Sequence, residues 1–415
     1  MSSIFDLREF KPLREKWDAR QKELSARGGY YDGSIYKKAL DGLWFLGPKA
    51  NGAVRPLFLP FARAVDVDAG VIPGGWEFPK EEARSDVWSK ARDALFDASQ
   101  WDTNGVLFVH YGAKYGVSGL RVSDSGGRVM VSPVDPTRFM LIYGDFYSPS
   151  PTMALWIENR VDEDGKKYEY AEVITPKAIS TFKNGEPFSF AAGVETTYDN
   201  PQGVIPIVEC VHINDGTELG ECTYQKAIVL LDEVNGMATR LSENIKKNDE
   251  AQTVITGAEP TDLQRGSDWA WFLPNGATAE FLVPRIDIPG VLEFIKEIKQ
   301  GVHDALPELS FDEIKKAGQI ATQTIELQLM EFVIKVQLTR PNYDRALVEA
   351  MKLAGAAAAR LNISAISPLN DPELILDKKR PVLPVMPKDA IDLQMAQIEL
   401  DNMRNASGAQ EGSRV

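Results

Sequence analysis

The most regular hydrophobic pattern in the chain runs through residues 221–248. Its apolar positions are spaced four and three residues apart, at Ala227, Leu231, Val234, Ala238, Leu241 and Ile245. This is a narrow seam of heptad type, and charged side chains occupy the rest of the surface. The pattern predicts a long helix that packs on neighbouring helices and leaves much of its surface wet.

Two further helices are predicted later in the chain. Residues 287–306 form the first, in which Pro289 suits the first turn. Its expected apolar face consists of Val291, Phe294, Ile298 and Val302. The second starts at residue 320 and is apolar on two faces. One face carries Ile325, Leu329, Phe332 and Val336, and the other carries Leu327, Met330, Ile334 and Leu338. A helix of this kind is buried on two sides, and Pro341 is expected to break or kink it.

Residues 101–206 change to short apolar runs separated by glycine-bearing turns, a pattern typical of antiparallel hairpins. The expected strand pairs are 119–122 with 128–131, 154–160 with 167–174, and 178–182 with 188–190. His110 falls in a strand-like stretch there and is interpreted as structural. Strands return at AQTVIT, DWAWFL and TAEFLVP, between residues 251 and 284. Strands beside helices predict an α+β fold.

The N-terminal region is helical by the same reasoning. Residues 9–26 are charged and favour a helix, which the glycines of GGYYDG (28–33) are expected to end. A second helix is predicted over 80–99.

Composition narrows the function. The chain has 415 residues, 44% of them hydrophobic, and a net charge of −14. This charge argues against an electrostatic nucleic-acid clamp, which needs clustered Lys and Arg. Cys210 and Cys222 suggest neither a disulfide framework nor a cysteine-rich metal site. The residues after Met1 lack the apolar core of a signal peptide, and no apolar run reaches the ~18 residues of a membrane span.

The chain carries no recognisable catalytic motif: P-loop, dinucleotide, zinc-protease and nucleophile-elbow signatures are all missing from the sequence. Asp66 and Asp68 could share a metal, although ending a helix is the simpler interpretation. Residues 162–164 resemble half of a calcium loop without its remaining ligands. The sequence therefore predicts no enzyme and no cofactor.

The order of the parts resembles that of portal proteins of tailed bacteriophages, in the large siphovirus group. RQKELSARGGYYDG (20–33) resembles the N-terminal helix of that family. SPVDPTRFMLIYGD, ALWIENR and KYEYAEVITPKAISTF resemble its wing strands. The run from Gly203 to Asn235, followed by AQTVITG, resembles the passage into its stem and clip. LNDPELILD (369–377) resembles the late return to the wing.

The resemblance implies a portal fold and a division of the chain into eight segments. These are an N-terminal arm (1–60), a β-rich wing (61–220), a first stem helix (221–248), a clip (249–286), a second stem helix (287–306), a tunnel loop (307–319), a spine helix with return strand (320–386), and a crown with tail (387–415). Both clip and crown are short for the family.

The resemblance also implies roles for particular residues. Leu231, Val234, Ala238, Leu241 and Ile245 would pack the stem helix beside its copies in a ring, which is dodecameric in this family. Lys315, Lys316 and Gln319 would face double-stranded DNA without sequence preference. Arg265, Trp269, Trp271 and Phe272 would contact neighbours, terminase or adaptor, although alternating aromatics in a strand also suit an ordinary hairpin core.

The implied partners are further copies of the chain, the terminase large subunit, a head-completion or adaptor protein, and major capsid and scaffolding proteins, with no membrane. The implied location is the portal vertex of a virion, after assembly in the host cytoplasm. Two alternatives stay open: another virion structural protein or adaptor, and an acid- or metal-dependent hydrolase. The portal interpretation predicts that Leu231→Asp and Leu241→Asp abolish ring assembly and leave soluble subunits.

Overall fold

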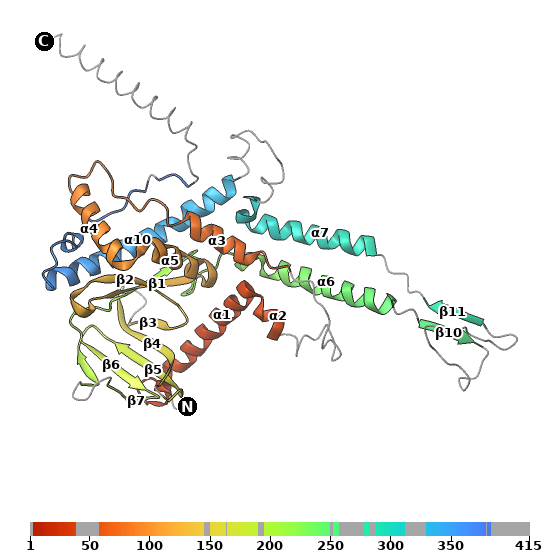
Figure 1. Ribbon diagram of the computed structural model, residues 1–415, viewed down its shortest axis with the longest axis horizontal. Coiled ribbons are helices and arrows are strands. Elements are labelled where there is room, and N and C mark those ends of the chain that lie inside the picture. Colours follow the sequence, from red (N-terminus) through yellow and green to blue (C-terminus); the bar gives the residue numbers. More distant parts are fainter. Residues whose placement is uncertain are drawn as a thin grey trace, which may run out of the picture. The chain divides into compact units, whose positions relative to one another are not determined.

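The computed structural model describes residues 3–38, 58–144, 150–162, 164–189, 195–249, 252–256, 278–282, 288–311, 329–378 and 380–382 (Figure 1). The chain forms two compact units. Unit 1 comprises Met1–Gln21, Val65–Cys222 and Ala321–Val415, and unit 2 comprises Lys22–Ala64 and Thr223–Ile320. Helices and antiparallel sheets together confirm the predicted mixed α and β class.

Unit 1 contains a three-stranded antiparallel sheet of order β2-β1-β9. Its strands are β1 (Val117–Ser123), β2 (Met130–Val134) and β9 (Ile207–Val211). Three helices contact this sheet: α4 (Ser85–Ser99), α5 (Trp101–Tyr115) and α10 (Met330–Arg360). The 3₁₀ turns η4 (Ser125–Gly127) and η8 (Ser367–Leu369) complete this part. The β1–β2 pairing confirms the first predicted hairpin.

The second sheet of unit 1 has six strands. Five follow one another in the order β3-β4-β5-β6-β7, and β8 pairs with β6. They are β3 (Phe139–Tyr143), β4 (Pro151–Val161), β5 (Lys167–Ile174), β6 (Ala178–Lys183), β7 (Glu186–Pro187) and β8 (Thr197–Asp199). The β4–β5 hairpin is confirmed. The partner strand of β6 was predicted at 188–190. The strand that pairs with β6 there is β7, which ends at Pro187, so the predicted position was a few residues too late.

Both faces of this sheet are covered by apolar residues of the same unit. On one face Phe139, Ala154 and Ile174 pack with Val134, Ile205 and Ile207. On the other, Leu155, Ala171 and Val173 pack against the N-terminal segment. That segment supplies Ile4, Phe5, Phe10 and Trp17.

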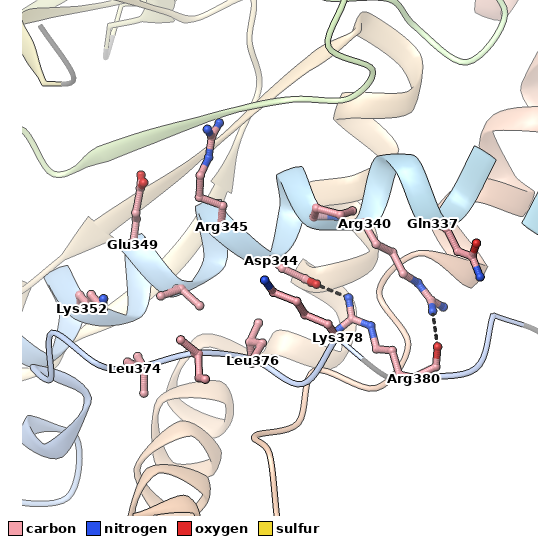
Figure 2. A pocket seen from close by; sticks show the side chains of 13 residues that line it. Gln337, Arg340, Asp344, Arg345, Glu349, Lys352, Leu374, Leu376, Lys378 and Arg380 are labelled. Carbon is pink, nitrogen blue, oxygen red and sulfur yellow. Dashed lines mark hydrogen bonds and ion pairs between the residues drawn. The ribbon is translucent and has the colours of Figure 1, made fainter. Parts of the chain in front are cut away.

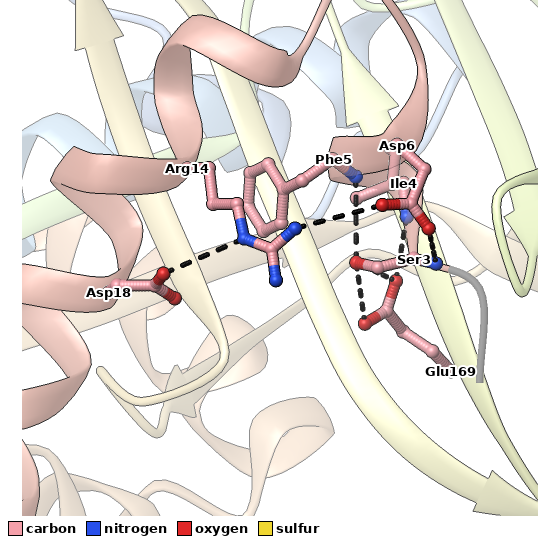
Figure 3. A network of polar contacts seen from close by, with 7 residues as sticks. All are labelled: Ser3, Ile4, Phe5, Asp6, Arg14, Asp18 and Glu169. Carbon is pink, nitrogen blue, oxygen red and sulfur yellow. Dashed lines mark hydrogen bonds and ion pairs between the residues drawn. The ribbon is translucent and has the colours of Figure 1, made fainter.

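Polar contacts fix the N-terminal segment on the sheet (Figure 3). The segment forms η1 (Ile4–Asp6) and η2 (Lys11–Leu13) before α1 (Arg14–Asp32). Glu169 of β5 accepts hydrogen bonds from the Ser3 hydroxyl at 2.8 Å and from the Ile4 amide at 2.9 Å. Asp6 accepts from the Ser3 amide at 2.9 Å, which closes a capping box. The carboxylate of Glu169 therefore satisfies donors that the short helix leaves unpaired.

The prediction of strands from residue 101 onward was wrong for 101–115, which form α5. Phe108, Val109 and Ala113 are buried there, so the apolar pattern has helical spacing despite its β-branched and aromatic residues. Gly112 lets α10 approach closely, since a Cβ at that position would lie 1.9 Å from the Tyr343 hydroxyl. His110 consequently lies on a helix and not on a strand.

Unit 2 holds most of α1 together with α2 (Ser34–Lys38), η5 (Gln225–Ala227), α6 (Ile228–Asp249), α7 (Ile288–Ala305) and η7 (Pro307–Leu309). Strands β10 (Gln252–Thr256) and β11 (Thr278–Leu282) pair antiparallel. Their positions confirm the strands predicted at AQTVIT and TAEFLVP. The glycines at 28 and 29 do not end α1, contrary to expectation. The helix continues to Asp32 and stops at Gly33, whose φ of 72° suits glycine.

Two predictions about the last third of the chain were wrong. The expectation that Pro341 breaks the helix is wrong, since α10 is one helix from Met330 to Arg360; a kink at Pro341 stays a prediction. The return strand expected near 369–377 is not a strand, although the Asp377 amide donates to the Glu77 carbonyl at 2.8 Å. Helix α3 (Phe61–Val71) begins in unit 2 and ends in unit 1.

Candidate functional site

Helices α6 and α7 lie side by side and share one small core (Figure 1). Val234 and Leu241 of α6 pack with Ile295 of α7. Val291 and Ile298 of α7 add to this cluster, and Val302 is buried on the same helix. Phe294, expected on the buried face, is 47% exposed, so Ile295 takes its place.

The residues of the predicted α6 seam differ in how far they are exposed. Leu231, Val234 and Leu241 are buried within the subunit, Ala238 is half-buried, and Ile245 is 44% exposed. The intrachain contacts of α6 with α7 account for the burial of Val234 and Leu241. Aspartate at Leu231 or Leu241 would therefore bury a charge inside the subunit, so such variants would not remain intact soluble subunits. A role for these side chains between subunits stays a prediction.

Two tyrosines hold α6 within unit 2: Tyr30 lies in the sequence GGYYDG near the end of α1, and Tyr36 lies on α2. The hydroxyls of Tyr30 and Tyr36 each donate to the Asp232 carboxylate at 2.8 Å. Burial, followed by the Asp232 hydrogen bond and charge, raises the pKa of Tyr30. Burial is also the largest cause that raises the pKa of Tyr36. Both phenols therefore stay protonated donors, and the sequence offered no signal that Asp232 was their acceptor.

A buried amide fixes the segment before α3 against the same helix. The Asn235 side chain accepts from the Phe58 amide at 2.8 Å and donates to the Phe58 carbonyl at 3.2 Å. Asn235 is 3% exposed, so these bonds satisfy a polar group that would otherwise be costly to bury. The Phe58 ring meets the Lys299 ammonium, 4.8 Å from the ring centroid. Neighbouring elements thus meet α6 at defined positions.

Apolar side chains remain exposed on three helices. Helix α10 exposes Met330, Ile334 and Leu338, which is 73% exposed. These positions recur every four residues and form one stripe, named here the α10 stripe. The opposite face, with Leu329, Phe332 and Val336, is buried as predicted, but the stripe itself was also expected to be buried and is exposed in the subunit. Helices α6 and α7 expose Val229 and Ile245, and Leu292 and Phe294, respectively.

Other predicted site residues lie outside the described part of the chain. These are Lys315, Lys316 and Gln319 of the predicted tunnel loop, and Arg265, Trp269, Trp271 and Phe272 of the predicted clip. The predicted crown also lies there. Their assignments stay predictions.

A buried polar network joins α3, the end of β9 and α10 in unit 1. His212 Nδ1 lies 2.8 Å from the Tyr343 hydroxyl, and its Nε2 lies 3.5 Å from Asp68 Oδ2. Lys335 Nζ lies 3.9 Å from the same carboxylate oxygen. His212 and Tyr343 are 0% exposed and Asp68 is 1% exposed, so a substrate has no access to them. Burial lowers the pKa of His212, against the raising effect of Asp68.

Asp66 and Asp68 do not converge as a shared metal site would require. Asp66 is exposed and lies 4.0 Å from His110 Nδ1, whereas Asp68 is buried beside His212. Within the described residues, no group of three or more His, Cys, Asp or Glu side chains could hold a metal ion. No helix in that same part of the chain has the length and apolarity to cross a membrane.

The described structure of unit 1 also holds a pocket of about 630 Å³ along α10 (Figure 2). Its second wall is the segment 374–380, which has no regular secondary structure where it is described. Arg380 pairs with Asp344, and Arg340 donates to the carbonyls of Pro381 and Val71 at 3.0 and 2.9 Å. Burial, followed by the charge of Arg380, lowers the pKa of Arg340 to about 10. The sequence did not single out these residues.

Comparison with known proteins gives one family. The model of the family described as "Phage portal protein, SPP1 Gp6-like" matches residues 99–363. No curated protein matches the chain.

Solved structures with distant similarity come from gene transfer agent (GTA) particles. "Virion of native gene transfer agent (GTA) particle" has 11% identity and a TM-score of 0.41, covering 81% of this chain and 91% of that one. "Neck of native GTA particle computed with C12 symmetry" has 12% identity and a TM-score of 0.42, covering 82% and 85%. "Neck of empty GTA particle computed with C6 symmetry" has 12% identity and a TM-score of 0.43, covering 75% and 85%.

Proposed function

The chain belongs to the phage portal protein family, SPP1 Gp6-like, and on this basis we propose that it is one subunit of a closed ring. The ring surrounds a channel for double-stranded DNA at one vertex of a virion. Genome packaging and ejection both use this channel. The family match covers residues 99–363, which include all three sheets, α6, α7 and the whole of α10.

The α10 stripe is the observation in the fold that carries ring formation. Met330, Ile334 and Leu338 are between 49% and 73% exposed, although Phe332 and Val336 on the same helix are almost fully buried. Each exposed side chain of this size gains about 1.5–3 kcal/mol when it is fully buried. A second copy that covers the stripe supplies that gain. Repetition of one such contact around an axis closes a ring when the rotation between neighbouring copies divides a full turn.

The α6–α7 pair supports the same proposal. Its core is small, and it leaves Ile245, Leu292 and Phe294 exposed. In the ring, the two helices form the stem beside copies of themselves. Residues 249–286 form the clip that meets the terminase motor and later the adaptor, through Arg265, Trp269, Trp271 and Phe272.

The negative net charge of the chain suits a channel through which DNA slides. A subunit with a net charge of −14 repels a duplex, so DNA slides without adhering at each phosphate. Lys315, Lys316 and Gln319 supply shallow contacts that do not depend on sequence. The expected number of subunits is twelve, as the family resemblance implies. Capsid and scaffolding proteins place the ring at its vertex during assembly in the host.

Charge substitution in the α10 stripe tests ring formation. Leu338→Asp and Ile334→Asp should leave a folded subunit and abolish the ring, because neither side chain is buried in the subunit. Val161→Asp is the matched control, since Val161 is an exposed apolar residue on β4. Sedimentation velocity should show the ring for wild type and Val161→Asp only. Rings of unchanged mass in Leu338→Asp would remove the stripe from the interface.

The DNA-facing role has a separate test. Replacing Lys315 and Lys316 with alanine should leave the ring intact and change the amount or rate of DNA packaged in an in vitro packaging reaction. Packaging indistinguishable from wild type would remove these lysines from the channel. The ring proposal would then stand on its own result.

A further inference from the structure

The pocket along α10 has the chemistry of a peptide-binding groove (Figure 2). Its charged lining is mainly cationic. Five cations, Arg340, Arg345, Lys352, Lys378 and Arg380, face two acids, Asp344 and Glu349. The surplus of positive charge is unusual in a chain whose net charge is −14. An acidic ligand would therefore be attracted to this site in preference to most of the surface.

Several of these cations are already used by the fold, but two are not. Arg380 is paired with Asp344, and Arg340 binds backbone carbonyls. Arg345 and Lys378 make no hydrogen bond or ion pair with any part of the chain that the structure describes, and both are exposed. The ammonium of Lys378 is thus available to a carboxylate of a ligand in the groove, whereas Arg345 points away from the segment with Leu374, Leu376 and Lys378 (Figure 2).

The wall opposite α10 offers backbone groups and an apolar surface. Within the described structure, Ile375 and Leu376 make no backbone hydrogen bond, so the N–H and C=O groups of the one that faces the groove can pair with an added strand. Ile375 is 49% exposed, and Pro341 and Val348 line the helical side. Figure 2 shows the segment with Leu374, Leu376 and Lys378 running alongside α10.

We propose that this groove binds an extended peptide from a partner protein, with acidic side chains alternating with apolar ones. The peptide backbone pairs with whichever of Ile375 and Leu376 turns its N–H and C=O groups toward the groove, its apolar side chains meet Ile375 and Val348, and a carboxylate meets Lys378. A volume of about 630 Å³ lies in the usual range for a ligand pocket, which is about 300–1,000 Å³. This inference concerns the single subunit and does not depend on ring formation or on the DNA channel.

A peptide fits these observations better than a nucleic acid does. Phosphates of a duplex would meet the cations but would leave the exposed Ile375 side chain and the free backbone groups without partners. Alternation in the peptide meets both requirements, because successive side chains of a strand point to opposite faces.

Fluorescence anisotropy with two labelled synthetic peptides tests the proposal on the full chain. One peptide alternates aspartate and leucine, and the control peptide alternates lysine and leucine. The acidic peptide should bind saturably and the basic one should not. Lys378→Glu and Ile375→Asp should each weaken binding about tenfold. Lys167→Glu and Val161→Asp change matched exposed residues on strands β4 and β5 and should bind as wild type does.

Four outcomes would overturn the proposal. One is the absence of saturable binding of the acidic peptide to wild type. Another is unchanged binding in Lys378→Glu and Ile375→Asp, with circular dichroism showing that both variants are folded. Displacement of the peptide by duplex DNA at lower concentration than by unlabelled peptide would assign the groove to nucleic acid. Tighter binding of a peptide copying residues 389–401 (DAIDLQMAQIELD) would assign it to the chain's own C-terminal segment.

Discussion

The six-stranded sheet of unit 1 and the α6–α7 pair of unit 2 bury their apolar residues to different extents. The sheet is covered on both faces, by the N-terminal segment on one side and by Val134, Ile205 and Ile207 on the other. The helix pair has a small shared core and leaves Ile245, Leu292 and Phe294 exposed. Regular hydrophobic spacing is common to both regions, so spacing alone does not separate a subunit core from an interface.

Helix α10 shows the same contrast within one element. Between Ala346 and Ala358 one face of the helix is buried within unit 1, whereas Met330, Ile334 and Leu338 are exposed. The buried apolar residues are Ala346, Leu347, Ala350, Met351, Ala354, Ala357 and Ala358. Within the described structure, a single chain buries the apolar side chains of one part of this helix and leaves those of another part exposed. We therefore expect substitutions of buried residues to lower the stability of the subunit, and substitutions of the exposed stripe to weaken ring association instead.

The largest effect is expected in the sheet core. Phe139→Ala removes a ring that is 0% exposed and should lower the free energy of unfolding by about 3–5 kcal/mol, because it leaves a cavity. Urea unfolding followed by far-UV circular dichroism measures this loss. The control Val161→Ala, at a residue 58% exposed, should cost less than about 0.5 kcal/mol. Equal losses would erase the contrast between core and surface.

A smaller effect is expected from the buried network of unit 1. His212→Asn should cost about 1–3 kcal/mol near neutral pH, because the buried Tyr343 hydroxyl loses its 2.8 Å partner and keeps, among the described residues, only the Val109 carbonyl at 3.5 Å. The loss is measured by the same urea titration.

The same variant should change the dependence of stability on pH. Burial lowers the pKa of His212 from its ordinary value of 6.5, so the unfolded chain binds more protons than the folded one below that pH. The unfolding free energy contributed by this residue is complete above the unfolded pKa and is lost as the pH falls toward the folded pKa. Between about pH 7.5 and about pH 5.5, His212→Asn should lose less stability than wild type. An identical loss in both proteins would show that His212 does not contribute.

In the helix pair, Tyr30→Phe and Tyr36→Phe should each cost about 0.5–1.5 kcal/mol, since each removes one hydrogen bond to Asp232. Hydrogen exchange of α6 amides should report the loss, with β4 and β5 unchanged. Because the two tyrosines share one acceptor, the double variant should not be additive. Strict additivity would mean that the two hydroxyls act independently.

The smallest effect on subunit stability is expected at the α10 stripe. Leu338→Ala should change the unfolding free energy by less than about 0.5 kcal/mol, since Leu338 is 73% exposed. The same variant should weaken ring association, which sedimentation velocity at several protein concentrations measures. A large loss of subunit stability would place Leu338 in the core.

The parts of the fold that the sequence predicted correctly are those marked by local patterns. The β1–β2 and β4–β5 hairpins are marked by turns and flanking apolar runs, which lie within a few residues of each other. Helices α6 and α7 follow from periodicity and from Pro289 in the first turn. These features need no knowledge of distant contacts.

Tertiary contacts decided the parts that the sequence predicted poorly. Helix α5 contains strand-favouring residues, but packing of Phe108 with Tyr343 and the close approach at Gly112 suit a helix. The choice between Phe294 and Ile295 as the buried residue depends on how α7 is turned toward Val234 and Leu241. The pocket along α10 joins residues that are 20 or more positions apart in sequence, such as Lys352 and Leu374. Neither the hydrogen bonds of Tyr30 and Tyr36 to Asp232 nor this pocket is marked by a local sequence pattern.

The mass of the purified chain in native mass spectrometry, with negative-stain images of the same sample, tests the central claim most directly. The account predicts a closed ring of about twelve 46.0 kDa subunits with a central hole. A stable dimer or tetramer without a hole would contradict it.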